Sequence, residues 1–267
     1  MDLTNRDALK VLLARYQLTL AKTYGQHFLV DRGVLEEIVA AAFPQRHGAV
    51  GRSPRVIEVG PGVGTLTREL AARAEHVVAI ERDPRFFSVL RETVAEFSNI
   101  ELIQADALRV SFAQFSPYHV ISNLPYEITT PFLWKILYEE QARPERAVLL
   151  LQRDIVDRIL ACPPRMNLLA LLAALVGKAR RVCAVSPRAF FPLPRVESAV
   201  LAIEDIEKFV SLEEKTVLAM AKRAFAAPRK KLSSTLGQTA GRFGNCRPAE
   251  LGVGEWKDMA AATVRGA

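Results

Sequence analysis

Short, almost wholly apolar runs alternate with longer segments of helical spacing through the first two thirds of the chain. Uniformly apolar runs are typical of strands that are buried on both faces of a parallel sheet. Strands are predicted at 55–59, 76–81, 100–104, 118–122 and 146–152, and helices at 4–19, 31–43, 65–74 and from Asp83-Pro84 onward, with Asp31 and Asp83 as N-caps. This alternation predicts an α/β fold with a mostly parallel sheet and helices on both faces.

The pattern changes near residue 205. Residues 211–244 have helical spacing in pieces that Pro228 interrupts, and 248–264 predict one more short helix. We therefore expect two domains, an α/β domain over 1–205 and a small helical domain over 206–267.

Charge is distributed unevenly between the two halves of the chain. The net charge is +7, with 17 Lys/Arg against 18 Asp/Glu in residues 1–150 and 19 against 11 in residues 151–267. A basic second half beside a neutral first half indicates a polyanionic partner such as nucleic acid, because phosphate neutralisation dominates nucleic-acid affinity. A solvated basic surface is the alternative.

The glycine-rich segment EVGPGVG, at 58–64, joins the first predicted α/β strand to its helix. Gly60 and Gly62 would let the backbone approach a ligand at the carboxyl end of the strand. The dinucleotide fingerprint G-x-G-x-x-G is not met, because position 65 is Thr65, and Pro61 removes an N–H that a pyrophosphate could use. A ligand without phosphate fits better, although such a segment can also be only a tight turn.

Acidic residues end the next two predicted strands. Glu81 could accept hydrogen bonds from both hydroxyls of a ribose, and Asp106 could accept one from an adenine amino group. Either residue alone could be a cap or a solvated group. Taken with Gly60, the series indicates S-adenosylmethionine as the ligand.

The fourth predicted strand leads directly into SNLPY, residues 122–126. Pro125 holds Leu124 extended, so that the Leu124 carbonyl and the Asn123 side-chain oxygen could face the same space. Two acceptors suit an exocyclic amino group, and Tyr126 offers a face for stacking a base. The alternative is an Asn-x-Pro turn with Tyr126 in the packing. Beside a methyl donor, the motif favours amino methyl transfer.

The cysteines, the apolar runs and the N-terminus bear on location. Three widely spaced cysteines, Cys162, Cys183 and Cys246, have no metal-ligand spacing and fit reduced thiols of a cytosolic protein. The apolar run at 168–176 is too short to span a bilayer, and MDLTNRDALK lacks a signal pattern. We expect a cytoplasmic protein without a metal or a membrane association.

Several motifs give the chain a clear resemblance to the ribosomal RNA adenine N6-dimethyltransferase family. They cover nearly the whole length: YGQHFLVD (24–31), EVGPGVGTLT (58–67), IERD (80–83), QADAL (104–108), NLPYEITTP (123–131), LLQRDIVDRI (150–159), FFPLPRVESAV (190–200) and FAAPRKKLSSTLG (225–237). NLPY and GPG resemble the bacterial small-subunit enzymes more than the Erm resistance methyltransferases. The resemblance implies a Rossmann-like class I methyltransferase fold with a seven-stranded sheet.

The resemblance also implies roles for individual residues. Methyl-donor contacts are implied for Leu29, Gly60, Glu81, Asp106 and Asn123; a catalytic pocket for Asn123, Leu124, Pro125 and Tyr126, with Phe190 stacking on the opposite face of the target adenine; and rRNA phosphate contacts for Lys222, Arg223, Arg229, Lys230 and Lys231.

Two positions depart from the family pattern. His27 replaces an Asn that touches the methionine end of the donor, and Ser122 stands where Gly is common. We keep His27 as a candidate cofactor-binding residue. A neutral His can donate one hydrogen bond with a different geometry, and a contact with the donor carboxylate would make donor affinity depend on pH.

The implied activity is S-adenosyl-L-methionine-dependent N6,N6-dimethylation of two adjacent adenosines in the 3′-terminal hairpin of small-subunit rRNA. The implied partner is rRNA in the pre-30S subunit, with the enzyme as a monomer. An Erm-type enzyme acting on large-subunit rRNA and a catalytically silent assembly factor on the same fold are the alternatives. A small-molecule amine methyltransferase is disfavoured by the basic second half.

Overall fold

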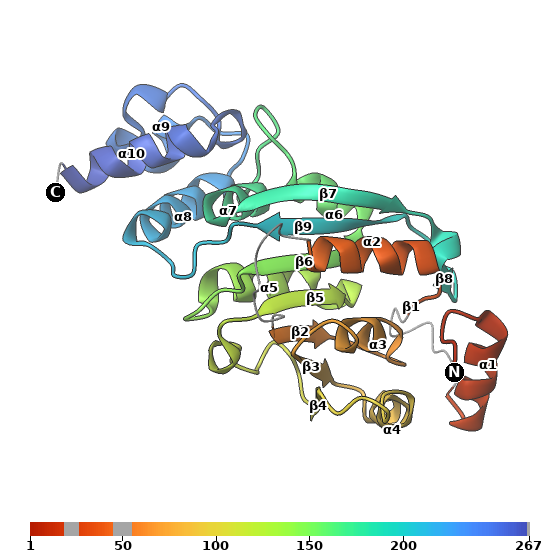
Figure 1. The fold of residues 1–267 in the computed structure, drawn as a ribbon. Coiled ribbons are helices and arrows are strands. Elements are labelled where there is room, and N and C mark those ends of the chain that lie inside the picture. The colour runs from red at the N-terminus through yellow and green to blue at the C-terminus, as the bar shows by residue number, and fades with distance from the viewer. Residues whose placement is uncertain (19–26, 45–54, 266–267) are drawn as a thin grey trace.

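The computed structural model describes residues 1–18, 27–44 and 55–265, and its centre is a mixed seven-stranded sheet (Figure 1). The strand order is β4-β3-β2-β5-β6-β9-β7. All neighbours among the first five strands pair in parallel, whereas β9 is antiparallel to both β6 and β7. The bounds are β2 Arg55–Val59, β3 His76–Glu81, β4 Ile100–Gln104, β5 His119–Asn123, β6 Arg146–Gln152, β7 Lys178–Val185 and β9 Ser198–Glu204. The predicted α/β class and sheet are confirmed.

Helices connect these strands and cover both faces of the sheet. The α-helices are α1 Arg6–Arg15, α2 Arg32–Ala42, α3 Thr65–Ala71, α4 Pro84–Thr93, α5 Thr129–Trp134, α6 Arg153–Ile159, α7 Leu168–Val176, α8 Leu212–Phe225, α9 Leu232–Leu236 and α10 Val253–Arg265. A π-helical turn, η4 Lys135–Glu139, follows α5. Short 3-10 turns lie at η2 Ala113–Phe115, η3 Tyr126–Ile128, η5 Pro187–Ala189, η6 Gly237–Phe243 and η7 Pro248–Glu250.

Most element predictions agree with the structure, and the differences lie at the ends. Asp31 and Asp83 cap α2 and α4 as expected, each by accepting a backbone N–H. The first helix ends at Arg15, before Gln17 adopts a positive φ of 52°; position 19 of its predicted range lies outside the described residues. β5 runs from 119 to 123 instead of 118 to 122.

Alternate side chains of each strand point to opposite faces of the sheet and enter two separate cores. On one face, Val56 and Ile121 pack with Leu35 of α2 and Leu70 of α3. On the other face, Ile57 belongs to a larger core that includes α5, α7 and the apolar sides of α8 and α10. The central strands are therefore buried on both sides, as their uniformly apolar sequences predict.

The C-terminal helices lie at the edge formed by α7 (Figure 1). Arg143, 1% exposed, joins them to the sheet through an ion pair with Glu214 of α8, with Nη1 and Oε1 at 3.1 Å. The fully buried Trp256 of α10 packs in the same core as α7. The division into residues 1–205 and 206–267 stays a prediction.

A second, two-stranded sheet lies at the carboxyl ends of the parallel strands. β1, Phe28–Leu29, pairs antiparallel with β8, Phe190–Phe191. Figure 1 shows both strands and α1 grouped at this edge. Segments from near the two ends of the α/β region are thereby brought to the place where parallel sheets bind ligands.

Within residues 1–18, 27–44 and 55–265, none of the helices combines the length and apolar character needed to cross a bilayer.

Candidate functional site

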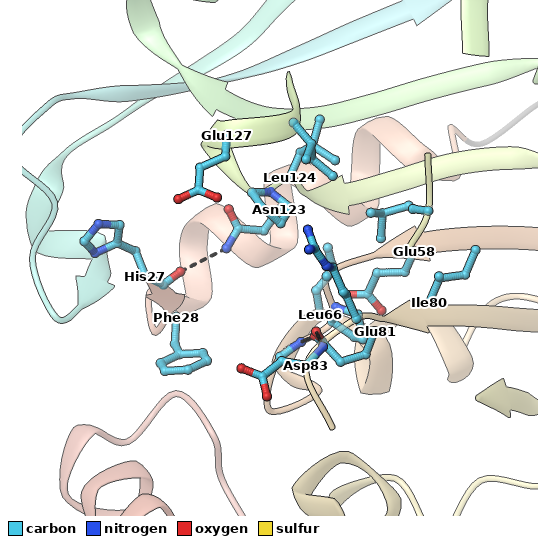
Figure 2. A pocket seen from close by; sticks show the side chains of 18 of the residues that line it. His27, Phe28, Glu58, Leu66, Ile80, Glu81, Asp83, Asn123, Leu124 and Glu127 are labelled. Atoms are coloured by element: carbon cyan, nitrogen blue, oxygen red, sulfur yellow. Dashed lines mark hydrogen bonds between the residues drawn. The ribbon is translucent and has the colours of Figure 1, made fainter. Parts of the chain in front are cut away.

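A cavity of about 610 Å³ lies at the carboxyl ends of β2, β3, β4 and β5 (Figure 2). It brings together ten of the residues predicted from sequence: His27, Leu29, Gly60, Gly62, Glu81, Asp106, Asn123, Leu124, Pro125 and Tyr126. Phe190 and the five basic residues between 222 and 231 are not among the residues that line it.

The glycine loop passes very close to the NLPY segment. Gly60 has a positive φ of 68°, and a Cβ at this position would lie 2.8 Å from Cγ of Pro125. Gly62 has a φ of 57°, and its Cβ would lie 3.0 Å from the ring of Phe28. A side chain would be strained at either position, would collide with Pro125 at position 60 and would crowd Phe28 at position 62, so the fold of the pocket itself favours both glycines.

Glu81 accepts one backbone hydrogen bond at each of its carboxylate oxygens, and one of these bonds holds the glycine loop. Oε2 accepts from the backbone N–H of Gly62 at 3.2 Å and Oε1 from that of Asp83 at 2.8 Å. Burial raises the pKa of the Glu81 carboxyl. Asp106 is fixed in a similar local way, because its Oδ1 accepts from the N–H of Leu108 at 3.0 Å. Each carboxylate keeps lone pairs for a ligand.

Glu58 lines the same cavity, although sequence reasoning gave it no role. It is 2% exposed, and burial raises its pKa to about 8. The buried hydroxyl of Thr65, at the start of α3, has no hydrogen-bond partner among the described residues. The sequence signal that could have identified Glu58 is its position directly before the glycine loop. Glu127, directly after NLPY, also lines the cavity beside Asn123 and was likewise missed (Figure 2).

Asn123 ends β5, and a long-range hydrogen bond fixes its side chain. Nδ2 donates to the backbone carbonyl of His27 at 3.1 Å (Figure 2). This bond leaves Oδ1 as an acceptor. The Leu124 N–H donates to the Leu150 carbonyl at 3.2 Å. Neither Asn123 Oδ1 nor the Leu124 carbonyl receives a hydrogen bond from another described residue. The structure thus leaves two acceptors on adjacent residues of the cavity wall.

Tyr126 is held at its hydroxyl, which lies 2.8 Å from Oγ of Ser198 at the start of β9. The side chain is partly buried, and this burial raises the pKa of its phenol. Ser122, buried below the motif, donates to the Val59 carbonyl at 2.6 Å. The serine therefore ties β5 to β2 and does not reach the cavity.

His27 has a different arrangement from the one expected. Its Nδ1 lies 2.8 Å from the carbonyl oxygen of Pro192. A carbonyl only accepts, so Nδ1 carries the proton and Nε2 of the neutral ring is an acceptor. The single donor of a neutral His27 is used within the protein, and only the doubly protonated ring could donate from Nε2 to a carboxylate. Cofactor binding by His27 stays a prediction.

Phe190 is fully buried in the core beside α2 and α3. Its ring meets that of His27 edge-on, with centroids 6.5 Å apart. Its neighbour Phe191 is partly exposed, and Lys10 Nζ lies 5.7 Å from the centre of its ring. In this conformation Phe190 supports the wall behind His27, and its stacking on a target base stays a prediction.

The predicted RNA-binding residues lie on α8 and the loop after it, away from the cavity lining. Lys222 Nζ sits 4.7 Å from the ring centre of Trp134 and 4.9 Å from that of Tyr138. Arg223 donates to the Thr235 carbonyl at 3.4 Å, and Lys231 to Asn245 at 3.2 Å. Arg229 and Lys230 are exposed and form no ion pair within the described chain. Of the five residues, these two are the most available for contact with phosphates.

Across the described ranges, no three His, Cys, Asp or Glu side chains are grouped closely enough to hold a metal ion.

The sheet order and the site define a class I methyltransferase, and structural comparison agrees. The chain superimposes on a dimethyladenosine transferase from Plasmodium falciparum with a TM-score of 0.74, 21% identity and coverage of 90% of this chain and 98% of the other. The 23S rRNA methyltransferase ErmE gives a TM-score of 0.71, 25% identity, and coverage of 88% and 98%.

Sequence comparison identifies the family. The sequence model named "Ribosomal RNA adenine dimethylase" matches residues 17–250. The chain is 34% identical over 254 residues to the ribosomal RNA small subunit methyltransferase A of Lactiplantibacillus plantarum, covering 91% of this chain and 83% of that protein. The chain belongs to the ribosomal RNA adenine dimethylase family.

Proposed function

We propose that the protein uses S-adenosyl-L-methionine to dimethylate N6 of two adjacent adenosines in the 3′-terminal hairpin of small-subunit rRNA. The observation that carries the proposal is the pair of acceptors, Asn123 Oδ1 and the Leu124 carbonyl, beside the Tyr126 ring. They share one cavity with Glu81 and Asp106.

The residues at the ends of β2, β3 and β4 fit the methyl donor. Glu81 would accept from the ribose hydroxyls, Asp106 from the adenine amino group, and the loop at Gly60 and Gly62 would pass beside the methionine part. Leu29, from β1, would cover the apolar side of the donor site. When bound, the donor supplies a methyl group activated by a sulfonium.

Asn123, Leu124 and Tyr126 would prepare the target amine. The nitrogen of adenine is a poor nucleophile, because its lone pair is delocalised into the ring. Acceptance of both N–H groups by Asn123 and Leu124 favours a pyramidal nitrogen, and stacking on Tyr126 holds the ring in line for displacement. Methylation makes the nitrogen cationic and its proton acidic, so no strong general base is required. Positioning and electrostatics supply most of the catalysis.

The C-terminal part, residues 206–267, would bind the rRNA. Arg229 and Lys230 are exposed beside Lys222, Arg223 and Lys231, and phosphates suit such a group. We further propose that the substrate is rRNA within the pre-30S particle, and that the enzyme acts in the cytoplasm as a monomer.

The small-subunit target is favoured over a large-subunit target by the similarity of whole chains. Identity to the small subunit methyltransferase A of L. plantarum is 34% over 91% of this chain. The NLPY and GPG motifs agree with this preference.

Methyl transfer from labelled donor to small ribosomal subunits that lack the modification tests the proposal. Digestion should release N6,N6-dimethyladenosine. Label on large subunits alone would support the Erm-type alternative. Absence of label from both subunits, with donor binding intact, would leave the catalytically silent assembly factor.

A further inference from the structure

The segment between β8 and β9, residues 192–197, forms an arch at the edge of the sheet that carries the cavity. At its start, the Pro192 carbonyl accepts from His27 Nδ1 at 2.8 Å. Directly after its end, Ser198 Oγ lies 2.8 Å from the Tyr126 hydroxyl. His27 and Tyr126 both line the cavity, and their ring centroids are 6.1 Å apart. Each end of the arch is thus attached to a ring in the cavity wall.

Further contacts hold the arch at its C-terminal end. The Arg153 N–H donates to the Glu197 carbonyl at 3.0 Å, and the two side chains form an ion pair. Ser198 pairs with Gln152, the last residue of β6, which places this end at the carboxyl edge of the sheet. Pro192 and Pro194 also restrict the backbone on both sides of Leu193.

Leu193 projects from this restrained arch into solvent. It is 54% exposed, and Val196 on the same arch is 43% exposed. Arg195 lies between them, is exposed, and forms no ion pair with any other described residue. A rigidly presented apolar side chain next to an uncompensated cation is an arrangement that suits an RNA helix, whose surface offers both stacked bases and phosphates.

The target adenine must leave its stack to reach Asn123 and Leu124, and this costs a few kcal/mol. Nucleic-acid-binding proteins insert apolar side chains, leucine among them, between neighbouring bases of a duplex. We propose that Leu193 is a wedge: it fills the gap in the rRNA hairpin that the target adenosine leaves when it enters the cavity, while Arg195 contacts a neighbouring phosphate. This inference rests on the proposed function.

The test compares Leu193→Ala with Leu193→Met, which keeps an apolar side chain of similar length. Val11→Ala is the matched control, because Val11 is 67% exposed on α1 and does not line the cavity. For methyl transfer to unmodified small subunits, kcat and KM are determined separately. Base extrusion is followed separately by the fluorescence of a hairpin RNA that carries 2-aminopurine at the target position.

We expect Leu193→Ala to lower kcat/KM by about 10- to 100-fold and to reduce the fluorescence rise on saturation with the enzyme. Donor affinity should be unchanged, and Leu193→Met and Val11→Ala should resemble the wild type. Leu193→Ala with normal transfer and normal fluorescence would overturn the wedge, and so would a loss that Leu193→Met fails to restore. In these two outcomes the wild type still methylates the subunits. A wild type that binds donor and labels no subunit would instead overturn the proposed function, and the wedge with it.

Discussion

The two halves of the cavity are held together in different ways. In the donor half, at the ends of β2, β3 and β4, the partners are close in sequence: Glu81 contacts Asp83 and Gly62, at separations of 2 and 19 residues, and Asp106 contacts Leu108. In the acceptor half, from Asn123 to Tyr126, they are distant. Asn123 bonds to a residue 96 positions away and Tyr126 to one 72 positions away.

The two halves of the cavity therefore depend on different parts of the fold. The polar groups of the donor half, at Gly60, Glu81 and Asp106, lie at strand ends and in the loops that follow them, so their placement needs only the parallel sheet. The acceptor half also needs β1 and β8 in place, because the His27 carbonyl and Ser198 orient its two key side chains. Changes in the acceptor half should therefore affect turnover, and changes in the donor half should affect donor affinity.

The largest expected effect is that of Asn123→Ala. The substitution removes the Oδ1 acceptor and the bond to the His27 carbonyl. We expect kcat to fall by about 10²–10³-fold, the usual cost of removing one preorganised polar group at a reacting centre. Donor affinity, measured by calorimetry, should stay within about threefold of the wild type.

Asn99→Ala is the control for this variant. Asn99 also donates Nδ2 to backbone carbonyls, those of Ala71 and Ala74 at 2.9 and 3.0 Å, but it does not line the cavity. The Asn99→Ala variant should lose stability and keep the wild-type turnover per folded molecule. Unchanged turnover in Asn123→Ala would refute the assignment of Asn123.

A smaller effect is expected from Glu58→Gln, which tests the buried acid of the donor half. Glu58 keeps its proton in the folded protein up to about pH 8, whereas the ordinary value is 4.5. Folding therefore takes up a proton between these values, and this contribution to stability is lost as the pH rises through that window. A difference of one pH unit between the folded and unfolded pKa corresponds to about 1.4 kcal/mol of unfolding free energy. After relaxation of the interior, we expect the wild type to lose roughly 2–3 kcal/mol of unfolding free energy across this window.

Urea unfolding at pH 5 and pH 9 measures this dependence. Glu58→Gln, which cannot ionise, should be more stable than the wild type at pH 9 and close to it at pH 5. Glu36→Gln, at an exposed position of α2, should follow the wild type at both pH values. A stability difference between Glu58→Gln and wild type that is the same at both pH values would contradict a proton on Glu58.

The same contrast explains what could be predicted from the sequence. β2, β3, β4 and β6 have the predicted bounds because apolar runs and their caps are local signals. Gly60, Glu81 and Asp106 line the cavity because they lie at or just after the carboxyl ends of strands, which is also a local signal. The contact of His27 with Pro192 spans 165 positions, and no local pattern encodes it. The burial of Phe190 likewise depends on the distant helices α2 and α3.

Glu81→Gln should weaken donor binding by about 10- to 100-fold, because an amide nitrogen would face one of two backbone N–H groups and one ribose hydroxyl would lose a charged acceptor. Turnover at saturating donor should recover most of its wild-type value, in contrast to Asn123→Ala. Calorimetric titration with the donor measures the affinity. Glu101→Gln, on the exposed side of β4, is the matched control; an equal loss in both variants would argue against a specific role of Glu81.

The smallest effect concerns Lys222, which lies outside both halves of the cavity. Its ammonium rests against Trp134 and Tyr138, so Lys222→Met should cost about 0.5–1 kcal/mol in unfolding free energy through the lost cation–π contacts. Lys230→Met, at an exposed position, should leave stability unchanged and lower the salt slope of subunit binding by about 1. If Lys222 acts only between the rings, Lys222→Met leaves the salt slope unchanged. A slope that falls equally in both variants would show that Lys222 leaves the rings to meet phosphate, as its place in the basic group on α8 predicts.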